Sequence, residues 1–333
     1  MILRPLCLGA ALLAALVVVP RASAETALLF ATAEPAPSAD SERVFRPWAE
    51  RVAAAAGGAV RIEVEDGTAS TTPATMYDRV TSDAVQIGLL IPSLAGGRFP
   101  STELAGLPFL TADSQRASVA FWRLYEWGGL TAEYKDIVPL AFALFPPQGV
   151  HLAKPPDTLE DLKGLRLRVV SKVGSDSVAR LGGTPLALDP GDQYEALQRG
   201  LLDGVVSSWL GIGPLHLDEV TSYHVETALG TGMFIVFMTK KKHDTLPAPV
   251  QRAIDAQSGE SLSRALAASF EQRSIEVRAP VEDSSKHTVV QLEGTPAKHW
   301  RDRTKPLIDE WAASHPGGAE LVATYRRLLA AVE

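Results

Sequence analysis

Several residue types that would define a chemistry are missing or scarce in this sequence of 333 residues. Asparagine is absent, so N-glycosylation has no acceptor, and Cys7 is the single cysteine. Cys7 lies in an apolar run near the start, inside a predicted leader. We therefore expect no disulfide, no cysteine nucleophile and no cysteine metal site in the exported chain. No later apolar run is long enough to cross a bilayer.

The first 24 residues have the three parts of a secretory signal peptide. Arg4 supplies the positive charge, the run from Leu6 to Val19 is apolar, and Ala22-Ser23-Ala24 is a small-residue cleavage site. The alternative, a membrane anchor, is less favoured because the run is short for a span and ends in Pro20-Arg21. We expect an exported chain that begins at Glu25.

The exported chain is acidic. Removing residues 1–24, which hold two arginines, leaves 30 basic against 39 acidic residues, a net charge of -9. An acidic exported protein is a poor candidate for binding nucleic acid or anionic lipid. The hydrophobic fraction of 46% suffices for one large domain or two of ordinary size.

Catalytic and metal-binding signatures are also missing. There is no Gly-x-Ser-x-Gly, no His-Glu-x-x-His and no phosphate-binding glycine loop. The seven histidines never fall at metal-ligand spacing. We expect no catalytic residue, no metal and no cofactor. A secreted hydrolase that pairs a serine with one of the histidines stays open as an alternative, as does a structural envelope protein.

The most informative stretch is 161–209, which predicts a strand–helix–strand–helix–strand module. Strands are expected near 165–170, 184–188 and 205–208, with helices near 173–181 and after Asp189-Pro190. Such alternation implies right-handed crossovers and a mostly parallel sheet, with ligands beyond the carboxyl ends of its strands. Further strands are expected near 27–31, 60–64, 85–90, 137–145, 233–239 and 289–292, and further helices near 41–56, 72–80, 114–127, 247–275, 305–312 and 318–331.

Polar and aromatic residues lie at these carboxyl ends. Arg168 offers a planar fork of donors that matches a carboxylate. The alternative is that Arg166 and Arg168 form the solvated face of an edge strand. Ser207 and Ser208 either donate hydroxyl hydrogen bonds to a ligand or form a turn. Trp209 either covers a ligand or belongs to a hydrophobic core.

The segments LEDLKGLRLRV, LGGTPLAL and QYEALQRGLLDG (159–169, 181–188 and 193–204) resemble the central signature of the solute-binding proteins of tripartite ATP-independent periplasmic (TRAP) transporters, the DctP family. Gln86-Ile87-Gly88, Leu107-Pro108-Phe109 and Leu246-Pro247 extend the resemblance over most of the exported chain.

The resemblance implies an α/β fold, the two-lobed periplasmic binding protein fold. Each lobe is expected to be a mixed sheet flanked by helices, with the ligand cleft between the lobes. After the signal peptide, 1–24, we expect lobe 1 to comprise 25–147 and 232–278. Lobe 2 is expected to comprise 148–231 and 279–333.

The resemblance also implies a function. A family member is a periplasmic, non-enzymatic protein of a Gram-negative bacterium, which captures a small organic acid and delivers it to a permease of small and large membrane subunits. A different ligand class, or an ATP-driven permease, stays open as an alternative.

The ligand residues follow from the same resemblance. Arg168 takes the role of the strand arginine that pairs with the carboxylate. Many members have an asparagine after Asp-Gly, where this chain has Ser207, and a second arginine in the preceding strand, where it has Gln148. Phe145 and Phe234, together with Trp209, indicate an apolar or aromatic acid.

Overall fold

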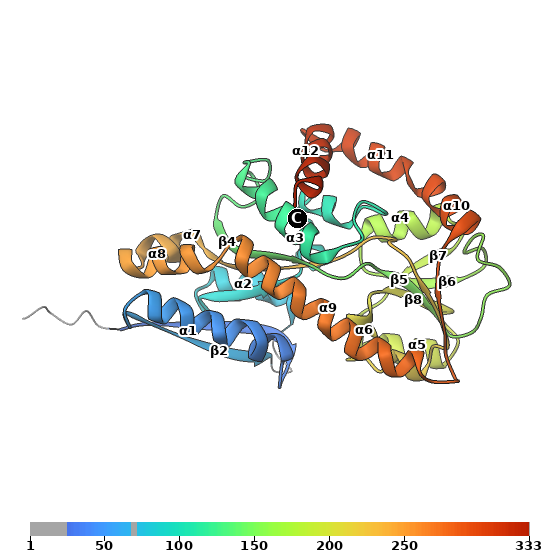
Figure 1. The fold of residues 1–333 in the computed structure, drawn as a ribbon, viewed down its shortest axis with the longest axis horizontal. Helices are drawn as coiled ribbons and strands as arrows, with labels where there is room; N and C mark the ends of the chain where they lie inside the picture. Colours follow the sequence, from blue (N-terminus) through green and yellow to red (C-terminus); the bar gives the residue numbers. More distant parts are fainter. Residues whose placement is uncertain (1–24, 68–71, 333) are drawn as a thin grey trace, which may run out of the picture.

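The computed structural model describes residues 25–67 and 72–332; the predicted signal peptide, 1–24, lies outside them. Two β-sheets lie side by side along the long axis of the molecule, with helices packed around each (Figure 1). We term the five-stranded sheet and its helices the first lobe, and the six-stranded sheet and its helices the second lobe. No helix in the described ranges combines the length and the apolar character needed to cross a bilayer.

The sheet of the first lobe has the strand order β2-β1-β3-β10-β4. Strands β1, β2 and β3 are parallel, and β10 runs antiparallel to both of its neighbours. The sheet is therefore mixed, and its fourth strand comes from a late part of the chain. The bounds are β1 (Thr26–Pro35), β2 (Val60–Gly67), β3 (Ile87–Leu90), β4 (Ile137–Leu144) and β10 (Met233–Thr239).

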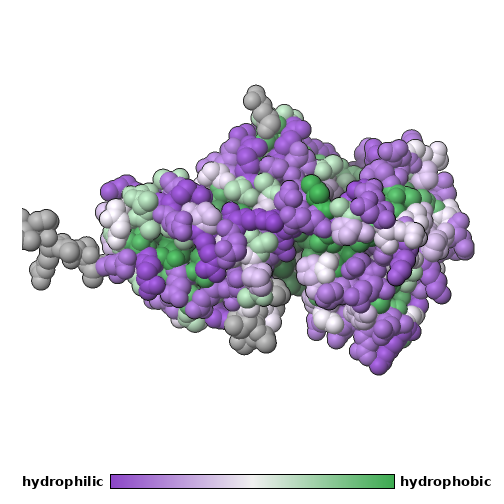
Figure 2. Space-filling model, turned by 60° about the horizontal axis from the view of Figure 1, so that its bottom comes forward, coloured by the Kyte–Doolittle hydropathy of each residue, from purple (hydrophilic) through white to green (hydrophobic). Residues whose placement is uncertain are grey.

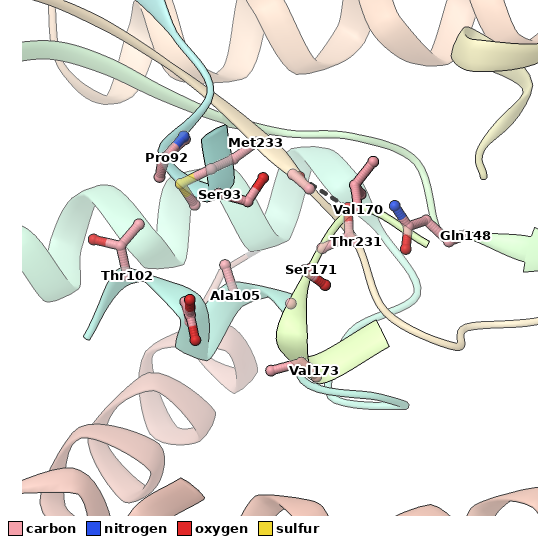
Figure 3. A pocket seen from close by; sticks show the side chains of 13 residues that line it. Pro92, Ser93, Thr102, Ala105, Gln148, Val170, Ser171, Val173, Thr231 and Met233 are labelled. Atoms are coloured by element: carbon pink, nitrogen blue, oxygen red, sulfur yellow. Dashed lines mark hydrogen bonds between the residues drawn. The ribbon is translucent and has the colours of Figure 1, made fainter. Parts of the chain in front are cut away.

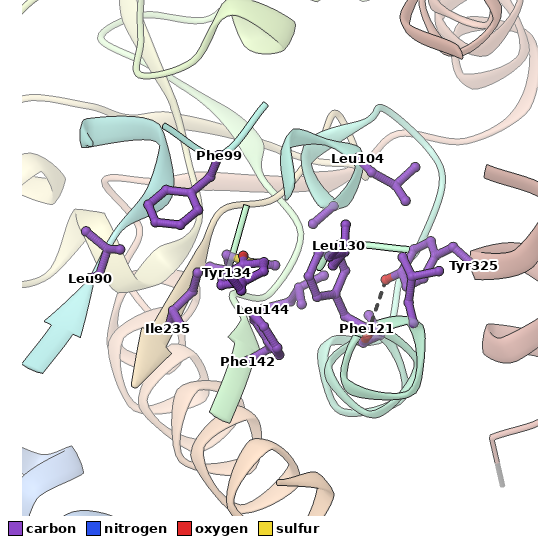
Figure 4. Close-up of a cluster of buried hydrophobic side chains, with 14 of the residues drawn as sticks. Leu90, Phe99, Leu104, Phe121, Leu130, Tyr134, Phe142, Leu144, Ile235 and Tyr325 are labelled. Carbon is purple, nitrogen blue, oxygen red and sulfur yellow. Dashed lines mark hydrogen bonds between the residues drawn. The ribbon is translucent and has the colours of Figure 1, made fainter. Parts of the chain in front are cut away.

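Helices cover both faces of this sheet, because its strands alternate apolar side chains between two cores. In β10, Ile235 and Phe237 enter one core and Val236 enters the other. In the first core, Tyr325 lies against Phe121 and donates a hydrogen bond to Ala117 O at 3.2 Å (Figure 4). The helices of this lobe are α1 (Arg46–Ala55), α2 (Pro73–Thr81), α3 (Ser114–Glu126), α7 (Lys240–Thr245), α8 (Ala248–Gln257) and α12 (Gly318–Ala330).

The sheet of the second lobe has the strand order β11-β9-β5-β8-β6-β7. The predicted module at 161–209 is confirmed as β6, α4, β7, α5 and β8, with β6 parallel to β7 and β8. Strands β5 and β9, which the sequence did not predict, are antiparallel partners in the same sheet. The bounds are β5 (Gly149–Leu152), β6 (Arg166–Val169), β7 (Thr184–Ala187), β8 (Gly204–Ser207), β9 (Tyr223–Glu226) and β11 (Thr288–Gln291).

Two hydrophobic cores lie against this second sheet. Its helices include α10, which the sequence did not predict. The bounds are α4 (Lys172–Arg180), α5 (Gln193–Gln198), α6 (Trp209–Ile212), α10 (Gly294–Thr304) and α11 (Pro306–Ser314). Short helical turns are η1 (Ser41–Phe45), η2 (Pro92–Leu94), η3 (Thr102–Gly106), η4 (Pro190–Asp192) and η5 (Leu217–Glu219).

The helix predicted over 247–275 is divided in two. Gly259, at φ +77°, separates α8 from α9 (Glu260–Glu282), because this left-handed conformation ends one helix before the next begins. Helix α9 continues to Glu282, beyond the predicted end at 275, and crosses the molecule diagonally (Figure 1). It packs on α3 and β4 of the first lobe and on α6 of the second.

Two extended segments also connect the lobes, 145–148 and 227–232. Their backbones are hydrogen-bonded, from Phe145 N to Gly232 O and from Gln148 N to Gly230 O, both at 2.9 Å. The predicted lobe boundaries stay a prediction, and one observation differs from them. Helix α12 packs on α3 of the first lobe, and α11 contributes Ile308 and Trp311 to the same core, rather than joining the second lobe with the rest of 279–333 (Figure 1).

Candidate ligand-binding site between the lobes

A cavity of about 220 Å³ lies between the lobes and is lined by residues of both. In a space-filling view the surface is notched between the two lobes, with hydrophobic residues at the base of the notch (Figure 2). Five of the six predicted ligand residues line this cavity: Phe145, Gln148, Arg168, Ser207 and Phe234. The cavity lies at the carboxyl ends of β6 and β8, the end of the second sheet at which the sequence predicted a ligand site.

A smaller cavity of about 50 Å³ adjoins the first and shares Ser93, Gln148, Val170 and Gly232 with it. Figure 3 shows first-lobe residues on one side, among them Thr102 and Ala105, and second-lobe residues on the other, among them Ser171 and Val173. Glu103 also lines this cavity, and burial raises its pKa. Both cavities thus belong to one cleft between the lobes.

Arg168 and Arg166 lie on the same strand but in different surroundings. Strand β6 is flanked by β7 and β8, so the edge of the sheet is β7. Arg166 is the solvated arginine: its Nε lies 2.9 Å from an oxygen of Asp203. Arg168, one strand repeat further toward the carboxyl end, is only 6% exposed. Arg168 is therefore buried and Arg166 is partly exposed, and neither lies on an edge strand.

The guanidinium of Arg168 is buried without a carboxylate partner. Its Nε donates a hydrogen bond to Leu188 O at 3.1 Å, and no other hydrogen bond or ion pair to it exists in the described part of the chain. Burial lowers the pKa of Arg168 to about 10, against the opposing charge of Asp189, so it stays protonated at neutral pH. A buried cation is costly unless an anion pairs with it. Arg168 therefore brings a buried positive charge to the wall of the cavity.

Two polar residues, Ser207 and Gln148, line the same cavity as this arginine. Ser207 Oγ donates to Ser208 O at 3.0 Å, so its proton is engaged while its oxygen can still accept a hydrogen bond. The Gln148 side chain is half-buried, and an amide offers both donors and an acceptor.

Three phenylalanines form an aromatic wall of the cavity: Phe145, Phe234 and Phe270. The ring of Phe145 lies 4.9 Å from that of Phe234 and 5.3 Å from that of Phe270, both in edge-to-face arrangements. These contacts hold the rings at angles that suit an aromatic or apolar ligand. Phe270 was not predicted, because nothing in the sequence of α9 shows that this helix reaches the cleft.

Trp209 does not line this cavity. Its ring packs against those of His151 and His224, at 4.8 and 4.9 Å between centroids, and its Nε1 donates to Glu226 at 3.0 Å. It borders a separate cavity of about 440 Å³, which Arg278 also lines. The structure therefore favours the alternative, that Trp209 belongs to the core of the second lobe.

Two charged residues of the cavity were not predicted, Glu34 and Arg273. Glu34 lies near the carboxyl end of β1. Ligands bind beyond the carboxyl ends of parallel strands, so the same reasoning applied to the first lobe would have located it. Arg273 extends from α9 and has no comparable signal. Arg273 Nη1 donates to Glu34 Oε1 at 2.7 Å and also pairs with Asp40.

Within residues 25–67 and 72–332, no cluster of three histidine or acidic side chains has the arrangement that holds a metal ion. The chemistry of the cavity is that of a receptor: a cation, hydrogen-bonding amides and hydroxyls, and an aromatic wall. These features, with two mixed sheets and a cleft between them, define the class of two-lobed binding proteins.

The family described as bacterial extracellular solute-binding protein, family 7 (DctP), matches residues 30–315. The chain belongs to this family, the solute-binding proteins of TRAP transporters, and is a binding protein rather than an enzyme. Family members are periplasmic, bind small organic acids and work with TRAP membrane components.

Solved structures of this family are similar over nearly the whole chain. One is a TRAP solute-binding protein from a marine metagenome, described as specific for aromatic acids and complexed with 3-hydroxybenzoate. It is 26% identical, with a TM-score of 0.84, and the match covers 93% of this chain and 100% of that one. Another, from Rhodoferax ferrireducens and complexed with benzoate, is 26% identical with a TM-score of 0.83, over 92% of this chain and 98% of that one.

A sequence relative is the transporter protein TsaT of Comamonas testosteroni, described as an outer membrane protein. It is 27% identical over 79% of this chain and 78% of its own.

Proposed function

We propose that this protein is a periplasmic receptor for an aromatic monocarboxylate, which it delivers to the small and large membrane subunits of a TRAP permease. The observation that carries the proposal is Arg168, a buried guanidinium without a carboxylate partner that shares a cavity with an aromatic wall. The relatives complexed with benzoate and 3-hydroxybenzoate support the same ligand class.

The aromatic wall supports a ring rather than an aliphatic chain. An aromatic ligand gains about 0.5–1.5 kcal/mol from edge-to-face contact beyond the area that it buries. The cavity volume of about 220 Å³ lies below the range of roughly 300–1,000 Å³ for drug-sized ligands, so a single ring with short substituents is favoured.

The test is calorimetric titration of the exported chain with benzoate. We expect Arg168→Ala to raise the dissociation constant at least about 30-fold, because breaking a buried charge pair costs about 2–5 kcal/mol. The same substitution should leave the unliganded protein as stable or more stable, since it removes an unpaired buried charge.

The matched control is Arg166→Gln, which changes the solvated arginine of the same strand. This variant should bind benzoate as the wild type does, within about threefold, because exposed ion pairs contribute little. If Arg168→Ala binds benzoate as tightly as the wild type, the carboxylate contact is wrong. If a well-folded wild type binds no aromatic carboxylate, the ligand class is wrong.

A further inference from the structure

A second polar group faces the cavity from the first lobe. Glu34 and Arg273 line the cavity that Arg168 lines from the second lobe. Their side chains are 12% and 20% exposed, and they are joined by the 2.7 Å hydrogen bond between Arg273 Nη1 and Glu34 Oε1. Ser38 Oγ donates to the other Glu34 oxygen at 2.7 Å, so the carboxylate is held at both oxygens.

The charge of this group is never positive. Arg273 is paired with two acids, Glu34 and Asp40, and Asp40 is completely buried. Burial and the charge of Glu34 raise the pKa of Asp40, against Arg273 and a hydrogen bond from Ser269. With Asp40 ionised the three groups sum to one negative charge, and with Asp40 protonated they are neutral. A second ligand carboxylate would therefore meet no net positive charge there.

The hydrogen-bonding positions of Glu34 and Arg273 that are still free fit a hydroxyl group of a ligand. Each Glu34 oxygen accepts one hydrogen bond and has room for another. The hydrogen bonds of Arg273 to Glu34 and Asp40 both come from Nη1, so its Nε and Nη2 have no acceptor among the described residues. A hydroxyl both donates and accepts, so it can bind to the carboxylate and the guanidinium together.

The position of this pair fits the far end of a bound ring. Phe270 and Arg273 are three residues apart on α9, so their side chains lie on the same face of the helix. A ring held against the aromatic wall, with its carboxylate at Arg168 of the opposite lobe, would carry its other substituents toward the first lobe.

We propose that Glu34 and Arg273 are specificity-determining residues, which select an aromatic monocarboxylate with a hydroxyl on the ring and reject a second carboxylate. This inference rests on the proposed function of the same cavity. It names two residues and the substituent they recognise.

The experiment compares three probes by calorimetry: benzoate, 3-hydroxybenzoate and isophthalate, in which the hydroxyl is replaced by a second carboxylate. The wild type should bind 3-hydroxybenzoate about tenfold more tightly than benzoate, the gain of one hydrogen bond to a charged group. It should bind isophthalate at least about tenfold more weakly than benzoate, because the second carboxylate stays unpaired.

Glu34→Gln should bring both ratios toward one, because it replaces the carboxylate that accepts from the hydroxyl and repels the second carboxylate. The matched control is Glu65→Gln, an exposed carboxylate on β2, which should keep the wild-type ratios. A wild type that binds the three acids equally, or a Glu34→Gln variant that keeps both wild-type ratios, overturns the inference and leaves the proposed function intact. A wild type that binds none of the three overturns the proposed function. Should Glu34→Gln not fold, the wild-type ratios decide by themselves.

Discussion

At the scale of single residues, Trp209 shows how a side chain next to the cleft can serve the core alone. It follows β8, whose last residue, Ser207, lines the ligand cavity. Its ring is nevertheless buried among imidazoles, and its indole N–H is bound to Glu226, which Arg278 holds from α9 at 2.6 Å. Trp209 thereby ties α6 to α9 through a shared carboxylate.

We expect Trp209→Phe to lower the free energy of unfolding by about 2 kcal/mol, through the lost hydrogen bond to a carboxylate and the smaller ring. Benzoate affinity should stay within about threefold of the wild type. Urea unfolding and calorimetry on the same samples measure both. A variant that loses tenfold in affinity with unchanged stability would show that Trp209 contacts the ligand.

Residue-level prediction succeeded where a strand placed the side chain and failed where tertiary packing did. Arg168, Ser207 and Phe234 lie on strands that the sequence predicted, the first from its alternating pattern and the other two from short apolar runs. Phe270 and Arg273 reach the cavity because α9 is long and crosses both lobes, and neither property can be inferred from its residues. Arg166 and Arg168 could not be told apart until the strand order was known.

At the scale of elements, three histidines connect strands β5 and β9 to the turn before β11. His151 Nδ1 lies 2.9 Å from His224 Nδ1, and His224 Nε2 lies 3.1 Å from His287 Nδ1. His151 Nε2 donates to Ser207 O at 3.1 Å, because a carbonyl oxygen can only accept. The protons are then ordered: His287 donates to His224, and His224 donates to His151. The chain is complete only with neutral His151 and His224.

This histidine chain predicts acid sensitivity. Burial lowers the pKa of His151 to about 4 and, with the neighbouring imidazoles, that of His224 to about 3. Both values lie below the usual value of about 6.5, so the stabilisation is present above pH 6.5 and is lost as the pH falls toward 4. We expect the free energy of unfolding to fall from pH 7.5 to 5, by up to about 2 kcal/mol for each histidine.

Urea unfolding at pH 7.5, 6 and 5 measures this dependence, with His151→Gln as the comparison. Its amide can still donate to Ser207 O but does not titrate, so the free energy of unfolding should fall by about 2 kcal/mol less than in the wild type. Asp40, with its raised pKa, contributes in the opposite direction but equally in both proteins. Equal pH dependence in the two proteins would contradict the role of the histidine chain.

Helices and strands whose own residues form a clear pattern were predicted. Those whose existence or position depends on pairing or packing with other elements were not. The module of β6, α4, β7, α5 and β8 has clear strand alternation and a proline at a helix start. Strands β5 and β9 are four residues each and are fixed by pairing with β8 and with one another. Helix α12 was predicted as a helix, but its place on α3 depends on the path of α10 and α11.

At the scale of the whole molecule, the described part of the chain crosses between the lobes four times, at 145–148, at 227–232, along α9 and through α11 to α12. The segments 145–148 and 227–232 are hydrogen-bonded side by side, and α9 packs on both lobes. The cavity lies between the lobes, with Arg168 on one and Glu34 on the other. A ligand whose carboxylate contacts Arg168 on one lobe and whose ring contacts Phe234 on the other stabilises the closed arrangement over an open one, because only closure allows both contacts.

We therefore expect benzoate to bring the lobes together. Cysteines at Glu50 on α1 and Lys298 on α10, both exposed, place one label on each lobe. The described residues contain no cysteine that would take up a label elsewhere. Spin-label distance measurements should show a shorter and narrower distribution on saturation with benzoate, since expelling water strengthens the pairing with Arg168. The same labels on Arg168→Ala should show no change at that concentration. A wild-type distribution that stays unchanged while calorimetry shows bound benzoate would mean that the cleft is already formed before the ligand arrives.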